Sequence, residues 1–260
     1  MQYVTSVLIW AGIVLLILIW LPMLFISRIF DRDPVRYRTG RLFRKMGLAI
    51  SRINPNWQVA IDGHDKIDDR NPYVVVSNHL SNADIPVISS LPWEMKWVAK
   101  KELFKLPFLG WMMRLAGDIP VDRKSSNKSI PVFKRCKFYL DRNVSVMFFP
   151  EGTRSRDGRL NRFAYGAFDL AIREKKPILP LVLEGTQDCL PKQSWNFQPD
   201  VFVKLKVLDP IETTNLEPED APELMKTVRD AIALQLSDWR QKPVSEVDAT
   251  YRNQQGDVAG

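Results

Sequence analysis

Apolar and charged positions are segregated along this chain. From Met1 to Ser27 no charged side chain occurs, and residues 7–19 are almost continuously apolar. At about 1.5 Å per residue, roughly 20 apolar residues in a helix match a hydrocarbon core of about 30 Å. The pattern therefore predicts a membrane anchor helix over residues 1–27.

Pro22 leaves the form of this anchor open. Because proline interrupts helical hydrogen bonding, the segment either spans the bilayer or forms a shorter helix and a turn, as in a monotopic hairpin. A cleaved signal peptide fits poorly, because no basic residue precedes the apolar run and no small-residue cleavage site follows it.

Residues 28–56 form a basic juxtamembrane segment. Between residues 28 and 58, eight basic side chains stand against two acidic ones, while apolar residues recur at helical spacing from Leu42 to Ile50. We predict an amphipathic helix lying on an anionic membrane surface, and the alternative is a solvated helix packed on the domain. The positive charge beside the anchor places the rest of the chain on the cytoplasmic side.

Residues 57–242 alternate short β-branched runs with helical stretches. Predicted strands are 58–62, 73–77, 96–99, 119–121, 145–149, 178–183 and 201–207. Fully apolar runs such as YVVV and VMFF are typical of strands covered on both faces, whereas VFVKLKV alternates and predicts an edge or half-exposed strand. The fold class is therefore α/β, with a sheet flanked by helices.

The helices of the same region follow from amphipathic spacing. They are predicted at 85–90, 101–115, 129–142, 164–175 and 222–241. Residues 243–260 are polar and end in glycine, so we predict a flexible tail.

Composition narrows the class of protein. A chain of 260 residues that is 45% hydrophobic and 26% charged can bury a sizeable core. Only two cysteines and two histidines occur, which excludes a disulfide scaffold and a structural zinc site, and we expect no metal. Six of the seven net positive charges lie in residues 28–58, so the basic character indicates membrane seating and not nucleic-acid binding.

A histidine and a carboxylate follow the strand YVVVS. His79 lies two residues past that strand, and Asp84 comes five residues later, at the start of the next predicted helix with Ser81 or Asn82 as its N-cap. In this arrangement the carboxylate can fold back to a ring nitrogen, so that the other nitrogen serves as a general base. The alternative is a loop histidine without a catalytic role.

Two further loops at strand ends carry basic side chains. Asp122 and Arg123 follow strand 119–121, and residues 151–156 follow SVMFF, with Gly152 permitting a tight turn. Arginine suits bidentate phosphate recognition, and Lys101 could add a point charge. Each arginine taken alone also fits a surface charge or a structural ion pair, which is our interpretation of Arg156 and Arg159.

Four ordered motifs resemble the glycerophospholipid acyltransferases. Residues 78–84 look like the NHxxxxD block, Gly117 to Arg123 like GxxxxDR, residues 149–155 like FPEGTRS, and residues 177–181 like the fourth, proline-bearing block. The resemblance covers residues 57 to 210, and its EGTR form points to the 1-acylglycerol-3-phosphate acyltransferase branch. It implies the glycerolipid acyltransferase fold, with a mixed, mostly parallel sheet after the membrane helix and the amphipathic helix.

The resemblance also implies an activity. It implies acyl transfer from acyl-CoA or acyl carrier protein to the 2-hydroxyl of lysophosphatidic acid in phospholipid biosynthesis, with membrane lipids as partners and no cofactor beyond the acyl thioester. His79 would be the general base and Asp84 its orienting residue. The acceptor's phosphate and glycerol would be held by Arg123, Glu151, Gly152, Thr153 and Arg154, with Lys101 as a further binding residue.

Two departures from the family pattern leave the acceptor open. Leu80 stands where glutamine is frequent, and the segment Phe163 to Gly166 lacks the lysine that commonly precedes that glycine. Another lysophospholipid, a lyso-aminolipid or glycerol-3-phosphate is therefore an alternative acceptor. A catalytically silent lipid-binding protein is the alternative of another class, and a hydrolase lacks support because no GxSxG motif occurs.

Overall fold

The computed structural model describes residues 2–68, 71–122, 129–191 and 194–251. The described residues form a seven-stranded sheet in the order β1-β7-β6-β2-β5-β3-β4, with five parallel pairs and one antiparallel pair, β6 with β7. The strands are β1 Trp57–Asp62, β2 Val74–Ser77, β3 Met95–Lys100, β4 Ile119–Val121, β5 Ser145–Phe148, β6 Ile178–Glu184 and β7 Val201–Val207. The predicted mixed, mostly parallel α/β sheet is confirmed.

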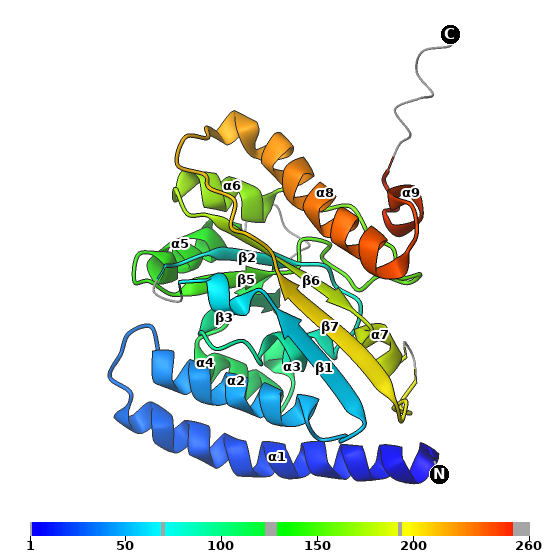
Figure 1. Cartoon of the computed structure of the whole chain (residues 1–260). Helices are drawn as coiled ribbons and strands as arrows, with labels where there is room; N and C mark the ends of the chain where they lie inside the picture. Colours follow the sequence, from blue (N-terminus) through cyan, green and yellow to red (C-terminus); the bar gives the residue numbers. More distant parts are fainter. Residues whose placement is uncertain (1, 69–70, 123–128, 192–193, 252–260) are drawn as a thin grey trace.

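Helices cover both faces of this sheet (Figure 1). The α-helices are α1 Gln2–Phe30, α2 Tyr37–Ser51, α3 Asp84–Ile88, α4 Leu109–Ala116, α5 Ser129–Leu140, α6 Gly166–Arg173, α7 Thr186–Cys189, α8 Ala221–Arg240 and α9 Val244–Val247, and the 3-10 turns are η1 His64–Lys66, η2 Leu103–Lys105 and η4 Pro218–Asp220. Helices α5, α6 and α8 cover one face, whereas α3 and α7 cover the other.

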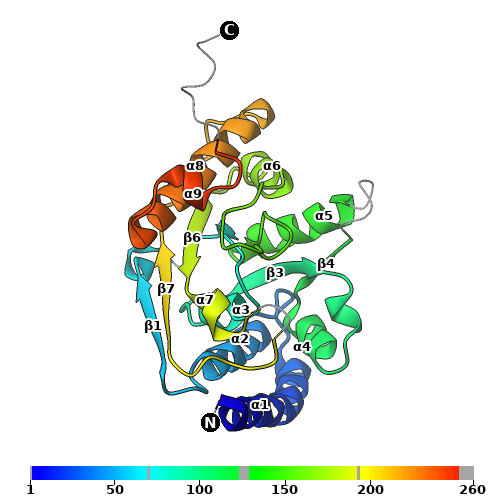
Figure 2. The ribbon, with the colours of Figure 1, turned by 90° about the vertical axis from the view of Figure 1, so that its right-hand side faces the viewer.

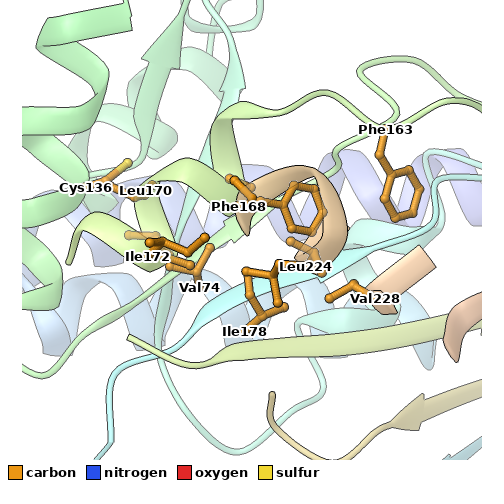
Figure 3. Close-up of a cluster of buried hydrophobic side chains, with 14 of the residues drawn as sticks. Val74, Cys136, Phe163, Phe168, Leu170, Ile172, Ile178, Leu224 and Val228 are labelled. Atoms are coloured by element: carbon orange, nitrogen blue, oxygen red, sulfur yellow. The ribbon is translucent and has the colours of Figure 1, made fainter. Parts of the chain in front are cut away.

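The central strands are apolar on both sides because each side meets a different core. Val74 and Val76 of β2 lie in the core under α5, α6 and α8, whereas Val75 lies in the core under α3 and α7. Figure 3 shows part of the first core, where Phe168 of α6 and Leu224 of α8 lie close together. Burial on both faces accounts for the unbroken apolar runs that the sequence displays.

The alternating strand β7 is half-exposed, as predicted, but it is not an edge strand. It lies between β1 and β6, and the edges of the sheet are β1 and β4. Val203 and Leu205 point into the core under α3 and α7, whereas Phe202 is exposed. The alternation therefore indicates a strand that is exposed on one face of the sheet, and not a strand that lacks a neighbouring strand.

The helix predicted for residues 101–115 is wrong in its first half. The structure has the short turn η2 and then begins α4 at Leu109. Pro107 lacks an N–H and disfavours helical backbone at Leu106, and Phe108 takes a positive φ of 61°. The chain therefore changes direction before α4 begins.

The apolar helix α1 lies along one face of the domain. It runs through Pro22 without a break and contacts the domain near both ends, because the amide of Phe197 donates to Ser6 Oγ at 2.9 Å and Ser27 Oγ lies 3.2 Å from Thr39 Oγ1. Residues 3–30 are long and apolar enough to cross a membrane, by length and composition only. Most of the outward face of α1 is exposed (Figure 1).

The predicted surface position of the basic segment is wrong for much of α2. Phe43, Arg44 and Met46 are buried, and α2 packs between α1 on one side and α3 and α4 on the other. Its buried apolar side chains therefore contact the rest of the protein. Exposed bases, including Arg38 and Lys45, remain on its outer surface.

The predicted flexible tail is wrong for residues 243–251, and residues 252–260 lie outside the described residues. Helix α9 packs against α8, and the buried carboxylate of Asp248 accepts a hydrogen bond from Arg229 Nε at 2.7 Å. The polar composition misled the prediction because a buried ion pair and the buried side chain of Val247 are enough to fix this segment.

Candidate active site

His79 and Asp84 meet at the carboxyl end of β2. The chain turns after Ser77, and α3 begins at Asp84 with Ala83, not the predicted Ser81 or Asn82, as its N-cap. His79 Nδ1 lies 2.6 Å from Asp84 Oδ2, with the histidine side chain 15% exposed and the carboxylate fully buried. The turn thus brings together two residues that one helix would separate.

Four donors hold the Asp84 carboxylate. The backbone amides of Leu80 and Ser81 donate to Oδ2 at 2.8 and 3.0 Å, and Thr186 Oγ1 donates to Oδ1. An ionised carboxylate can only accept, so Nδ1 of His79 carries the hydrogen and Nε2 is left as an acceptor. The arrangement gives His79 the tautomer that a general base needs.

The ring of His79 is also fixed from the side. It stacks on Phe149 with ring centroids 4.0 Å apart and an angle of 17° between the planes. Phe149 follows β5, which lies next to β2 in the sheet. The stack restricts rotation of the imidazole about its side-chain torsions.

Asn78 anchors the loop that carries His79. Its Nδ2 donates to the carbonyl of Leu183 at 2.9 Å, and the amide of Leu183 donates to Asn78 Oδ1 at 2.8 Å. This side chain reproduces the pairing of a strand residue beyond the end of β2. The loop therefore begins at a fixed point of the sheet.

The Glu151 carboxylate binds the His79 loop. The amide of His79 donates to Oε1 at 2.7 Å, while the amide and Nδ2 of Asn161 donate to Oε2 at 3.0 and 2.7 Å. The carbonyl of His79 accepts from the amide of Ser155 at 2.8 Å. Both oxygens of Glu151 thus accept hydrogen bonds within the protein and position the His79 loop, while the contact of Glu151 with the acceptor stays a prediction.

Burial raises the pKa of Glu151 to about 7, against the lowering effect of its three hydrogen bonds. The folded state therefore binds a proton that the unfolded chain releases near the ordinary pKa of 4.5. Because the folded pKa is the higher one, this contribution to stability is complete below about pH 4.5 and is lost as the pH rises through about 7.

Glu151→Gln should destabilise the protein more at pH 5 than at pH 8. A glutamine presents an NH₂ group to one of the donors, which costs about 1–3 kcal/mol, and it removes the proton-linked contribution of at most about 3 kcal/mol. Chemical unfolding of both proteins at the two pH values measures the difference. A loss of stability that is equal at pH 5 and pH 8 would contradict the assignment.

A pocket of about 430 Å³ lies beside the His79 loop. Its lining includes Leu80, Ser81, Arg154, Arg156 and Arg240. Within the described part of the chain, Arg154 and Arg156 have no hydrogen-bond or ion-pair partner, whereas Arg240 pairs with Glu184. The pocket therefore presents two arginines without a partner among the described residues, beside the loop that carries His79.

The other predicted binding residues are placed differently. Gly152 has a φ of 70°, as its turn requires, and Thr153 is exposed on the same loop. Lys101 pairs with Asp122 at 2.5 Å and lines a separate pocket, so the structure does not bring it to the His79 site. Arg123 lies outside the described residues.

Sequence reasoning missed several neighbours of the site. Thr186 binds Asp84 from 102 residues along the chain, and Asn161 binds Glu151 from ten residues along it, and no motif spacing marks either contact. Arg156, which was interpreted as a surface or structural charge, lines the pocket, whereas Arg159 has the structural role and donates to the carbonyls of Ser245 and Asp248.

The buried cysteines are poor nucleophiles. Burial raises the pKa of both Cys136 and Cys189 to about 12. The thiolate is the reactive form of cysteine, and at neutral pH these thiols stay protonated.

A family model described as Acyltransferase matches residues 58–184. The 1-acyl-sn-glycerol-3-phosphate acyltransferase of Limnanthes douglasii is 32% identical over 222 residues, covering 82% of this chain and 75% of that protein. The chloroplastic enzyme of that name from Arabidopsis thaliana is 37% identical over 163 residues, 62% of this chain and 46% of the relative. The alpha form of the enzyme from Mus musculus is 36% identical over 174 residues, which cover 66% of this chain and 61% of the mouse protein.

The chain thus spans about half the length of the chloroplastic relative. Among solved structures, the 1-acyl-sn-glycerophosphate (LPA) acyltransferase PlsC from Thermotoga maritima is similar with a TM-score of 0.75. The similarity covers 91% of this chain and 96% of the Thermotoga chain at 23% identity, which establishes the shared fold.

Proposed function

The chain belongs to the family of 1-acyl-sn-glycerol-3-phosphate acyltransferases, and from this premise we propose that it acylates the 2-hydroxyl of lysophosphatidic acid to form phosphatidic acid. The acyl donor is a thioester, acyl-CoA or acyl carrier protein. One arrangement supports the proposal above all others: the His79–Asp84 contact lies beside a pocket in which Arg154 has no partner within the described residues.

The reaction uses His79 first as a base and then as an acid. Nε2 takes the proton of the acceptor hydroxyl while its oxygen attacks the thioester carbonyl, and Asp84 stabilises the imidazolium that forms. The tetrahedral intermediate then collapses, the carbon–sulfur bond breaks, and the thiolate takes the proton from His79. Acyl transfer is direct, so no covalent acyl-enzyme is needed and neither cysteine takes part.

Arg154 binds the phosphate of the acceptor in this proposal. A guanidinium without an internal partner keeps all its donors for a ligand, and it can bind phosphate through two parallel hydrogen bonds. The same loop contributes Gly152 and Thr153, while Glu151 holds the His79 loop in place. Fixing the phosphate positions the hydroxyl for attack, which lowers the entropic part of the barrier.

Arg154→Ala should raise the KM for the lysophosphatidic acid acceptor about 10- to 100-fold, as expected for a lost charged hydrogen bond of 1.5–3 kcal/mol, and should leave the KM for the acyl thioester unchanged. Steady-state kinetics with each substrate varied in turn measures both constants. Arg142→Ala is the matched control, because Arg142 is exposed and precedes β5 at the opposite end of the sheet. An unchanged acceptor KM in Arg154→Ala would argue against this assignment.

The proposed membrane attachment follows from α1. Its contacts with the domain extend from Ser6 to Ser27, about 32 Å of helix at 1.5 Å per residue. A helix bound to the domain over this length cannot leave it to cross a bilayer, so we propose that α1 lies in the plane of the membrane with its exposed apolar side in lipid. We place the catalytic domain on the cytoplasmic side because exposed bases such as Arg38 and Lys45 favour the anionic cytoplasmic leaflet, and protease accessibility in inverted and right-side-out vesicles tests this.

The experiment that tests the proposed function offers purified protein one labelled acyl-CoA, or the same acyl group on carrier protein, with a panel of acceptors. The panel contains lysophosphatidic acid, lysophosphatidylcholine, a lyso-aminolipid and glycerol-3-phosphate. Phosphatidic acid as the main product supports the proposal. Product formed only with another acceptor would replace the substrate, and no product with any acceptor would refute the activity.

A further inference from the structure

A second pocket lies along the outer edge of β4, on another part of the molecule than the His79 site. This β4-edge pocket has a volume of about 560 Å³. Figure 2 shows β4 at the rim of the sheet, between α5 and α4. Its lining residues are Arg36, Lys101, Phe104, Lys105, Arg114, Gly117, Asp118, Pro120 and Arg135.

The β4-edge pocket carries an excess of positive charge. Five of its lining residues are basic, and the acid among them, Asp118, is already paired with the buried Arg44. Lys101 is balanced by Asp122. Lys105 has no hydrogen-bond or ion-pair partner within the described ranges.

Neutral oxygens hold the three arginines of the pocket. Arg36 Nη1 donates to the carbonyl of Arg114 at 2.5 Å, and Arg114 Nη2 donates to the carbonyl of Phe104 at 2.9 Å. Arg135 Nη2 donates to the hydroxyl of Tyr139 at 2.9 Å. These contacts orient the guanidiniums without neutralising them, so the charge stays available for an anion.

The backbone conformation at Arg36 and the absence of a side chain at Gly117 allow these cations to lie close together. Arg36 takes the left-handed conformation, with φ 54° and ψ 44°, which is unfavourable for a residue with a side chain. Burial lowers the pKa of Arg36, and the nearby charges of Arg28 and Arg135 lower it further. A Cβ on Gly117 would lie 2.8 Å from the hydroxyl of Tyr139, so this position is kept clear for the tyrosine that binds Arg135.

The β4-edge pocket is too far from His79 to hold the acceptor's phosphate during the reaction. Strands β5 and β3 lie between β2 and β4, and three inter-strand spacings of about 4.8 Å separate β2 from β4 by about 14 Å. The lining residues of the two pockets do not overlap. A phosphate group bound in the β4-edge pocket would therefore belong to a different molecule from the acceptor bound at His79.

Exposed apolar side chains next to the pocket indicate which anion reaches it. Leu106 and Phe108, between η2 and α4, and Trp111, in the first turn of α4, are exposed and follow Lys105 in the chain. Ile29 and Phe30, at the end of α1, are 75% and 77% exposed, six to seven residues before Arg36. The cations thus lie where an apolar surface meets a polar one, as at the headgroup level of a bilayer.

We propose that the β4-edge pocket binds the headgroup of an anionic phospholipid, whose acyl chains lie against Leu106, Phe108, Trp111 and the end of α1. The inference rests on the proposed membrane face of α1, and it does not require the catalytic role of His79. The lipid is a bound membrane component rather than a reactant. A bound headgroup would fix the depth and tilt of the domain relative to the lipid from which the acceptor enters.

The test uses full-length protein and a lipid that is neither substrate nor product. Native mass spectrometry of the protein in neutral detergent counts bound phosphatidylglycerol and, separately, phosphatidylcholine with the same chains. The pocket variant is Lys105→Gln with Arg135→Gln, because neither side chain donates to the backbone in the hydrogen bonds described. Arg36→Gln is a second variant of the same pocket.

The matched control is Arg38→Gln with Lys45→Gln, which removes the same charge from exposed positions of α2 outside the pocket. Wild-type protein should bind one phosphatidylglycerol at least tenfold more tightly than phosphatidylcholine. The pocket variant should lose this preference, and the control variant should keep it. Arg154→Ala should also keep it, so the result does not depend on the proposed function.

Three results would overturn the proposal. The first is an equal loss of the preference for phosphatidylglycerol in the control variant, which would show that diffuse surface charge binds the lipid. The second is a loss of this preference in Arg154→Ala, which would place the lipid in the catalytic pocket. The third comes from titrating coenzyme A and inorganic phosphate in parallel. If the pocket variant no longer binds coenzyme A or inorganic phosphate but binds phosphatidylglycerol normally, the pocket binds a soluble phosphate compound and not a lipid.

Discussion

His79→Ala is expected to lower kcat for acyl transfer at least about 1000-fold, within the 10²–10⁴ that positioned proton transfer contributes. The hydroxyl of the acceptor is a weak nucleophile until a base removes its proton, and His79 is that base in the proposed reaction. The side chain is 15% exposed and bonds only to Asp84 through Nδ1, so its removal leaves Asp84 with its three other donors. The variant should therefore stay folded.

The chain supplies its own control for this experiment. Its other histidine, His64, lies in η1 before β2, and His64→Ala should leave turnover unchanged. Initial rates with saturating acceptor and thioester give kcat for both variants, and circular dichroism checks the fold. Turnover of His79→Ala within tenfold of the wild type would refute the general-base role.

The second large effect is expected from a buried group of four charges. Arg44 of α2 bonds to Asp118 at 2.5 Å, and Lys96 of β3 bonds to Glu94 at 2.9 Å, with all four side chains at most 4% exposed. Lys96 also donates to the carbonyl of Ala116 at 2.8 Å. The group thereby joins α2 to β3 and to the end of α4.

The charges in this group depend on one another. Burial opposes the charge of Arg44, but Asp118 and Glu94 raise its pKa above the ordinary value. Burial raises the pKa of Glu94, against the lowering effects of Lys96 and Arg44. Removing one cation leaves two carboxylates facing one lysine in a buried site, and this imbalance is costly.

Arg44→Met should therefore lower the free energy of unfolding by about 3–5 kcal/mol, the cost of leaving a buried charge without its partner, and the melting temperature by roughly 10 °C. Lys137→Met is the comparison variant, because it breaks exposed ion pairs with Asp141 and Glu174 and should cost less than about 1 kcal/mol. Thermal unfolding at one scan rate measures both. A loss in Arg44→Met no larger than in Lys137→Met would show that the group does not hold α2 in place.

This buried group explains why the prediction for α2 was wrong. A helix on a lipid surface and a helix whose basic side chains pair with buried carboxylates show the same alternation of basic and apolar residues in their sequences. Arg44 belongs to the second kind, and its partners Glu94 and Asp118 lie 50 and 74 residues later in the chain. No local pattern carries that information, because pairing over such distances is decided by how the sheet and α2 come together.

The candidate site was accessible to sequence reasoning where the distances along the chain were short. His79 and Asp84 are five residues apart, so a strand end followed by a helix start constrains their geometry strongly. Glu151 belongs to the same motif as Arg154, yet only the structure separates their roles, because one side chain turns to the amide of His79 and the other to the pocket. Lys101 shows the opposite outcome. Its charge and its position in the sequence suited phosphate binding at the His79 site, but the structure places it in another pocket.

By itself, the sequence determined the α/β class, the positions of the seven strands, the apolar helix at the start and the pairing of His79 with Asp84. These features depend on local periodicity and on chain connectivity, which a sequence contains directly. The tertiary structure decided that α1 lies along the domain, that α2 is buried, that Glu151 supports a loop, and that a second cationic pocket forms beside β4. Each of these depends on contacts between residues far apart in the chain, whose free energy exists only once the layers have packed.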